Sequence, residues 1–118
     1  MGTRAQVLIE DTKVYLYQHW SGNRLLDTVV ESMKKCSDRW DDPEYLTRII
    51  FCDMVRYDLD GHTGYGIGNS QHGDIEYLVK VDCKKKTVKL YTSGNDFKRC
   101  WTTIPFKDLL EEVNHGSA

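Results

Sequence analysis

The chain has 118 residues, of which 40% are apolar and 29% charged, with a formal net charge of −2. That length suits a single domain over residues 1–118 with a core of its own. The proportion of apolar to charged residues is typical of a globular protein and argues against a disordered or fibrous one. Nucleic-acid binding normally leaves a basic footprint, so the composition predicts no nucleic-acid partner. No apolar run nears the ~20 residues that span a bilayer, and no basic region with an apolar run opens the chain. We therefore expect a cytoplasmic protein without a membrane partner.

The first predicted elements form a β-hairpin. Residues 4–10 contain an apolar, partly β-branched run, and Asp11-Thr12 supplies a polar turn. A second run over residues 14–17 continues to His19-Trp20, where Ser-Gly-Asn breaks the pattern. Short strands joined by a tight polar turn are typical of a hairpin.

Two amphipathic helices follow, each with apolar residues spaced three or four apart. We expect the first helix to begin with Asn23 as its N-cap. The second begins at Asp42-Pro43, because Asp is a favoured cap and Pro suits the first helical position, and it runs to about Tyr57. The expected buried stripes are Leu26, Val29, Val30, Met33, Cys36 and Trp40 in the first helix and Leu46, Ile49, Ile50, Met54 and Tyr57 in the second.

Three strands and a short helix are predicted for the second half. Residues 74–81 and 87–92 form the clearer hairpin, residues 99–104 a weaker strand, and Pro105 admits a short helix. The order β-β-α-α-β-β-β-α predicts a single α+β domain with a mainly antiparallel sheet and helices packed on it. The inward-facing residues are expected to be Ile75, Tyr77, Val79 and Val81 in the first strand and Phe106, Leu109, Leu110 and Val113 in the helix.

The cysteines indicate no special site. No Cys-x-x-Cys pair occurs among the four, which argues against a zinc site or redox motif. Cys36 and Cys52 fall within helical patterns and are expected to be core residues without disulfides. The basic residues near the second hairpin turn, for which a solvated turn is favoured over a basic patch, are Lys84, Lys85, Lys86 and Lys89.

The segment 61–73 carries five of the nine glycines and two of the four histidines. Glycine-dense loops on a rigid sheet commonly carry binding groups. The segment lacks the Gly-Lys-Ser/Thr of a Walker loop, and its glycine spacing before a strand does not fit a dinucleotide turn. An anion-binding backbone nest, a glycine-rich turn and an edge strand remain as interpretations.

The histidines divide into loop and strand-end positions. His62 is expected to be exposed in the loop, and His115 lies in a polar tail. His72 is more informative, because His72 and Asp74 are two residues apart on an extended chain and so project to the same side. No histidine spacing typical of a metal site occurs, so we expect neither metal nor cofactor.

Several stretches resemble one family of small proteins encoded by bacteriophages, archaeal viruses and genomes that carry their integrated elements. Its members typically begin Met-Gly-Thr-Arg, as here in Met1-Gly2-Thr3-Arg4-Ala5, and continue to a stretch of His or Gln, then Trp or Phe, then Asp-Gly-Tyr-Pro, here Tyr17-Gln18-His19-Trp20-Ser21-Gly22. Gly73-Asp74-Ile75-Glu76-Tyr77-Leu78 followed by Thr87-Val88 is similar as well. Ser21 replaces the usual Asp, and Asn23-Arg24 the usual Tyr-Pro. The resemblance implies a mobile-element context, in which small proteins block a host defence component or sequester a signalling nucleotide.

The favoured hypothesis is a non-catalytic viral or mobile-element binding protein whose partner is a host protein or a small nucleotide. Arg4 would hold a phosphate or carboxylate and Trp20 would offer a stacking face. The structural alternatives are a surface salt bridge for Arg4, a cover of the core for Trp20, and a hydrogen bond to a backbone carbonyl for His19. The predicted ligand-binding residues are Arg4, His19, Trp20, Tyr65, His72 and Asp74.

Two other classes of function stay open. A small hydrolase or phosphodiesterase-like enzyme would use His72 and His19 as acid and base. A homodimer or interaction protein would use an exposed sheet edge or the region around Trp101.

Overall fold

A six-stranded sheet with the strand order β3-β2-β1-β4-β5-β6 organises the protein. The computed structural model describes residues 3–110. Four of the five strand pairings are antiparallel and β1–β4 is parallel, which confirms the predicted α+β class. The elements are β1 (Ala5–Ile9), β2 (Val14–Gln18), α1 (Leu25–Lys35), α2 (Pro43–Met54), β3 (Tyr65–Gly68), β4 (Tyr77–Asp82), β5 (Thr87–Thr92) and β6 (Cys100–Pro105), with 3-10 turns η1 (Gly22–Arg24), η2 (Ser37–Arg39) and η3 (Ser93–Asn95).

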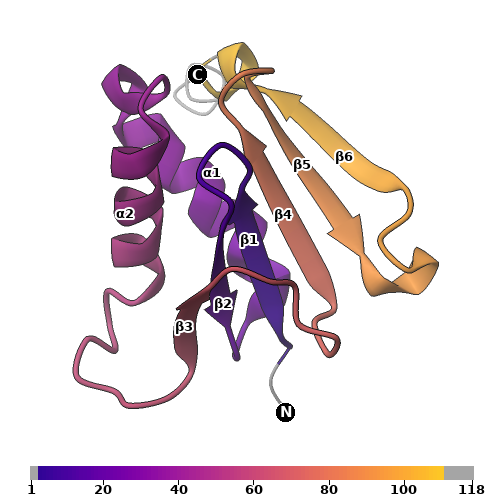
Figure 1. Cartoon of the computed structure of the whole chain (residues 1–118). Helices are drawn as coiled ribbons and strands as arrows, with labels where there is room; N and C mark the ends of the chain where they lie inside the picture. Colours follow the sequence, from indigo (N-terminus) through magenta and orange to yellow (C-terminus); the bar gives the residue numbers. More distant parts are fainter. Residues whose placement is uncertain (1–2, 111–118) are drawn as a thin grey trace, which may run out of the picture.

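Helices α1 and α2 lie on one face of the sheet (Figure 1). Side chains alternate across a strand, so every second residue of β1 and β4 faces these helices. Helix residues and strand residues share one buried cluster, which Phe106 and Leu109 of the helical segment 106–110 complete. No helix within residues 3–110 is long and apolar enough to cross a membrane. The strand and helix residues at the centre of the cluster include Val7, Ile9, Leu16, Leu25, Val29, Leu46, Ile50 and Val79.

The two helices begin differently from one another. Asp42 caps α2 as predicted: the Tyr45 backbone N–H donates to its carboxylate at 3.3 Å, and Pro43 is the first helical residue. The predicted Asn23 cap is wrong, because Asn23 lies inside the 3-10 turn η1 and α1 begins at Leu25. The fully buried Leu25 therefore heads the stripe, where Leu26 was expected.

Both helices also end earlier than their apolar patterns suggest. At Cys36 the backbone leaves the helical region, with φ −135° and ψ 46°, so α1 stops at Lys35. Trp40 nevertheless packs against the core, reached through η2. Helix α2 stops at Met54, and Tyr57 is 95% exposed, so Tyr57 is no part of the buried stripe.

The second half contains one more strand than predicted, which gives the order β-β-α-α-β-β-β-β-α. Because β4 starts only at Tyr77, Ile75 is buried on the face opposite to Val79, and the prediction that both share a face is wrong. Leu110 is exposed, which corrects its predicted inward orientation. Val113 and His115 lie outside the described residues.

The four cysteines are free thiols in different settings. Cys36 is buried as expected, whereas Cys52 is exposed on α2, so its prediction as a core residue is wrong. Cys83 is buried as well, and burial, together with Asp11 beside it, raises the pKa of this thiol to about 12. The buried thiols therefore act as small apolar groups.

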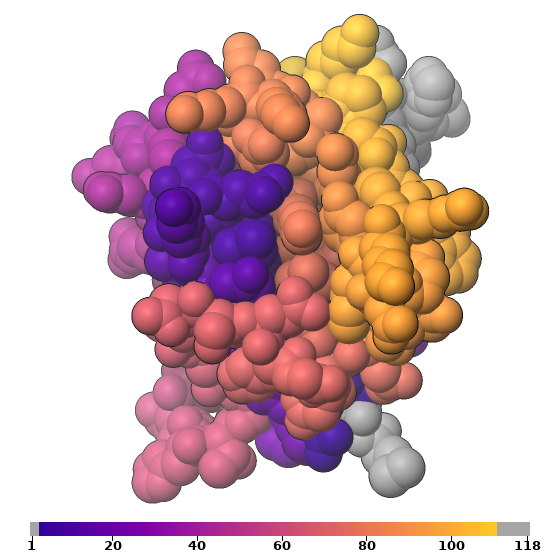
Figure 2. All heavy atoms as spheres, turned by 45° about the vertical axis from the view of Figure 1, so that its right-hand side comes forward, coloured from indigo at the N-terminus to yellow at the C-terminus, as the bar shows by residue number. Residues whose placement is uncertain are grey.

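The connection from β3 to β4 covers the other face of the sheet. These strands run in the same direction on either side of the β2–β1 pair, so the chain must cross both strands between them. Residues 69–76 make this crossing, which passes in front of β2 and β1 in Figure 1 and lies against the indigo hairpin in Figure 2. We call residues 69–76 the crossover.

Candidate functional site

One end of the sheet gathers all six residues predicted to bind a ligand. Because β1, β3 and β4 start at this end and β2 finishes there, residues next to these strand ends become neighbours. Five of the six are joined to one another by a hydrogen bond, an ion pair or ring contacts, and the sixth, His72, is joined to them through the ring of Tyr17. We call this group, together with Tyr17, the strand-end cluster: Arg4, Tyr17, His19, Trp20, Tyr65, His72 and Asp74.

His19 stands at the centre of the cluster and accepts two hydrogen bonds. Arg4 Nε donates to His19 Nδ1 at 3.3 Å, and the Tyr17 hydroxyl lies 3.0 Å from the same nitrogen. A guanidinium can only donate, so Nδ1 must be the acceptor and the neutral ring carries its proton on Nε2. The Tyr17 hydroxyl must therefore also donate to Nδ1. His19 is thus satisfied by side chains, not by the backbone carbonyl that is its usual structural alternative.

Arg4 and Asp74 form the charged part of the cluster. Their side chains pair at 3.5 Å and are 42% and 55% exposed, so water screens the pair and it contributes at most about 1 kcal/mol. Burial and the Asp74 charge raise the pKa of Tyr17, against an opposing effect of Arg4. Tyr17 consequently remains a neutral phenol at physiological pH.

The imidazole of His72 lies over the Tyr17 ring. Their centroids are 4.7 Å apart, and the planes are inclined by 30°. His72 is exposed and belongs to the crossover, whereas Tyr17 belongs to β2. The Tyr17 ring therefore contacts both His19 and His72.

Gln6 fixes the crossover in this position. Its side chain is 1% exposed, its Nε2 donates to the Ser70 carbonyl at 3.2 Å, and its Oε1 accepts from the His72 N–H at 2.8 Å. A buried amide without partners would be costly, so the crossover satisfies Gln6 while Gln6 holds the crossover. A further backbone bond, from Glu76 N–H to the Arg4 carbonyl at 2.8 Å, anchors the end of the crossover.

Trp20 is packed on one side and open on the other. Its indole contacts His19 edge-on with centroids 5.1 Å apart and Tyr65 at 6.4 Å, and it is 44% exposed. Gly64 lies beneath the ring with φ +97°, and a Cβ there would overlap the indole. The alternative interpretation of Trp20 as a cover of the core does not hold, because Trp20 is not among the residues packed against the buried cluster.

The glycine-rich segment 61–73 contains the edge strand β3 and the loops on either side of it. Gly66 and Gly68 lie in β3, paired with Tyr17 and Tyr15, which confirms the edge-strand interpretation. A Cβ at Gly66 would make an ordinary van der Waals contact, and one at Gly68 would meet no atom within 4 Å. Gly64 is therefore the glycine of this strand region that a larger residue could not replace without strain. His62 is exposed as expected.

Sequence reasoning missed Gln6 and Tyr17. Gln6 is a polar residue inside the apolar run of the first strand, and this interruption was the available signal. Tyr17 falls on the same side of β2 as His19 by simple alternation. Its role depends on the crossover returning over β2, which no local pattern indicates.

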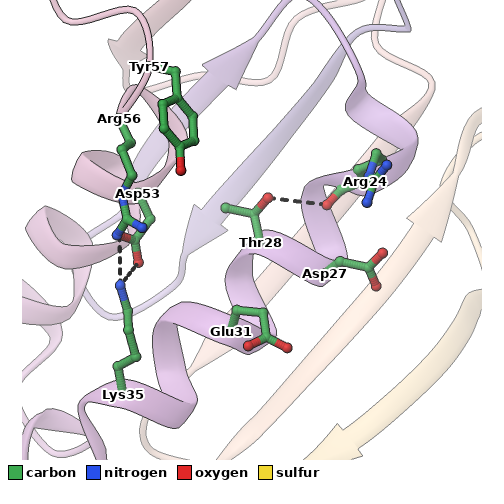
Figure 3. A pocket seen from close by; sticks show the side chains of 8 residues that line it. All are labelled: Arg24, Asp27, Thr28, Glu31, Lys35, Asp53, Arg56 and Tyr57. Atoms are coloured by element: carbon green, nitrogen blue, oxygen red, sulfur yellow. Dashed lines mark hydrogen bonds and ion pairs between the residues drawn. The ribbon is translucent and has the colours of Figure 1, made fainter.

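A polar groove lies elsewhere, between α1 and α2 (Figure 3). It encloses about 410 Å³, and Lys35 and Arg56 gather around Asp53, whereas Arg24 lies at the other end of the groove. Asp53 accepts from Ser32 at 2.5 Å and Lys35 at 2.8 Å and pairs with Arg56. This carboxylate is therefore already engaged in fastening the two helices together.

Within residues 3–110, no three His, Cys, Asp or Glu side chains are grouped to hold a metal ion. The strand-end cluster offers instead a guanidinium paired with a carboxylate, two imidazoles, two phenols and a half-exposed indole. Such groups suit recognition of an anion attached to a planar ring.

Comparison with known proteins gives no match: no family model, no curated protein and no solved structure corresponds to this chain.

Proposed function

We propose that the protein is a small binding module of viral or mobile-element origin that captures a nucleotide at the strand-end cluster and so acts against a host defence. The observation that carries this proposal is the convergence of Arg4, His19 and Trp20 with His72 from the crossover at one end of the sheet. The mobile-element context rests on the sequence resemblance alone.

The chemistry of the cluster supports a nucleotide as the ligand. A base stacks on the open side of the Trp20 indole, as bases commonly do on exposed aromatic rings. A phosphate lies beside Arg4, whose weak, half-exposed contact with Asp74 is readily exchanged for a charge-assisted hydrogen bond. Asp74 then becomes free to accept from a sugar hydroxyl or an amino group.

The arrangement of the histidines favours binding over catalysis. His19 Nδ1 is occupied by Arg4 and Tyr17, which leaves only Nε2 for a substrate. His72 contacts the Tyr17 ring, so Tyr17 is the group that the two imidazoles share. A phosphodiesterase-like reaction remains the second candidate, because two imidazoles next to one phenol are groups that can exchange protons.

The test is thermal unfolding with a panel of mononucleotides and cyclic oligonucleotides. A ligand at a hundred times its Kd stabilises a protein by about 2.7 kcal/mol, which is a shift of several degrees. Arg4→Ala should abolish the shift, whereas Arg99→Ala, an exposed arginine beyond β5, should leave it unchanged. If no nucleotide stabilises the protein, the nucleotide proposal fails and a host protein becomes the partner to seek.

Turnover distinguishes the second candidate. Incubation with the same nucleotides should leave them intact. If product forms, and His72→Ala abolishes it at an unchanged melting temperature, the protein is an enzyme.

A further inference from the structure

A second cavity of about 490 Å³ lies at the end of the sheet opposite to the strand-end cluster. It is formed where β4 turns into β5 and where β6 continues into the segment 106–110. Its apolar lining consists of Trp40, Pro105, Phe106 and Leu110. The volume falls within the range of sites that hold small molecules.

Among residues 3–110, the charged groups of the lining are all positive. They are Lys85, Lys86 and Lys107, and no carboxylate of that part of the chain lines the cavity. Among residues 3–110, none of these lysines forms an ion pair. Three ammonium groups beside an apolar floor complement a ligand that has an apolar body and an anionic end.

The floor of the cavity is built rigidly. Trp40 Nε1 donates to the Met33 carbonyl at 2.8 Å, and the Trp40 and Phe106 rings pack with centroids 5.3 Å apart. Phe106 is 2% exposed, and its N–H donates to the Lys86 carbonyl at 2.8 Å, which ties the hairpin turn to this floor. A site that is already shaped loses little conformational entropy when a ligand enters.

We propose that this cavity binds a small amphipathic organic anion, with its hydrocarbon or ring body on Trp40 and Phe106 and its anionic group among the three lysines. The site is separate from the strand-end cluster and does not depend on the nucleotide proposal. It also gives a role to the lysine-rich turn, for which a solvated surface was the favoured prediction.

The test uses 8-anilinonaphthalene-1-sulfonate, whose emission rises in apolar sites, with decanoate as competitor. Decanoate should displace the dye, whereas uncharged decanol at equal concentration should displace it at least tenfold less effectively. The triple variant K85Q/K86Q/K107Q should weaken dye binding at least tenfold. The matched variant K84Q/K89Q/K98Q, with the same change of net charge, should weaken it less than twofold.

Nuclear magnetic resonance locates the ligand. Decanoate should shift the Trp40 indole N–H and leave those of Trp20 and Trp101 in place. Equal competition by decanol, equal weakening in both triple variants, or no shift at Trp40 would each overturn the proposal. Circular dichroism and the melting temperature confirm that both triple variants are folded.

Discussion

The two faces of the sheet are held by different forces. Within residues 3–110 the helix face shares a cluster of 18 buried apolar residues, whereas the buried apolar cluster on the crossover face is Leu8, Ile75 and Leu78. The crossover face adds hydrogen bonds from Gln6 and ring contacts of Tyr17. Apolar burial is the main source of folding free energy, so the helix face holds the fold together while the crossover face opens more easily.

This difference explains where polar groups can converge. A side chain such as His19 on the helix face would be buried without partners at a cost in free energy, but on the crossover face it meets Arg4, Tyr17 and water. The part of the candidate site around Tyr17, His19 and His72 therefore lies on the face that contributes less to stability, whereas Tyr65 packs against the buried cluster of the helix face.

The largest expected effect concerns the helix face. Leu16 is fully buried there, and Leu16→Ala should lower the free energy of unfolding by about 2–5 kcal/mol because it leaves a cavity. Leu8→Ala, on the crossover face of the neighbouring strand, should lower the free energy of unfolding by less than Leu16→Ala does. Urea denaturation measures both, and equal losses would contradict the proposed division of forces.

Gly64→Ala should have the next largest effect. An alanine at φ +97° is strained, and its methyl group would displace the Trp20 indole, so we expect a loss of about 2 kcal/mol. The matched control is Gly68→Ala at the end of β3, the strand that Gly64 precedes, where a Cβ meets nothing within 4 Å. Urea denaturation compares the two, and an equal loss of stability in both variants would show that the Trp20 contact is not what requires this glycine.

Gln6→Leu tests the fastening of the crossover. It leaves the Ser70 carbonyl and the His72 N–H without their partner, which should lower the free energy of unfolding by about 1–3 kcal/mol. Hydrogen exchange should accelerate for the amides of residues 69–74, with α1 and α2 unaffected beyond the global change. Gln71→Ala, an exposed position in the same segment, serves as the control. Unchanged exchange in Gln6→Leu would show that the crossover is held by other contacts.

Asp53→Asn should have a smaller, pH-dependent effect on the helix layer. Burial alone would raise the pKa of Asp53, but hydrogen bonds from Lys35 and Ser32 and the charges of Lys35 and Arg56 outweigh it and hold the pKa below its usual value. A lowered folded-state pKa stabilises the protein above about pH 4, and this contribution disappears as the pH falls through that folded-state value. The free energy of unfolding of the variant should therefore be about 1 kcal/mol lower than that of the parent protein at pH 7. This difference in stability should become smaller as the pH approaches 3. A difference that is independent of pH would contradict this assignment.

Local patterns predicted much of the helix layer and both hairpins. The apolar runs of β1 and β2, the alternation in β4 and β5 and the Asp42-Pro43 start of α2 depend on neighbours in sequence, so they could be predicted from local patterns. The early ends of α1 and α2 could not, because tertiary packing decides where a marginal last turn stops.

The residues of the candidate site could be predicted from the sequence, but the contacts among them could not. Arg4, His19, Trp20 and Asp74 stand at the ends of elements, where polar residues next to apolar runs can be recognised. The partners of these residues depend on the crossover passing back over β2 and β1, which involves residues about 65 positions apart in sequence. No pattern in residues 69–76 indicates that path, so the contacts of Gln6 and Tyr17 with the crossover could be recognised only from the structure.

The most direct test of the binding site is a titration of the ¹⁵N-labelled protein with the nucleotide that stabilises it most. We expect chemical-shift changes at the Trp20 indole N–H and at the amides of Arg4, His19, His72 and Asp74, with the Trp40 indole unchanged. Arg4→Ala should remove these changes while the spectrum remains that of a folded protein. Shifts confined to other surfaces, or none with any nucleotide, would contradict the assignment of the strand-end cluster as the ligand site.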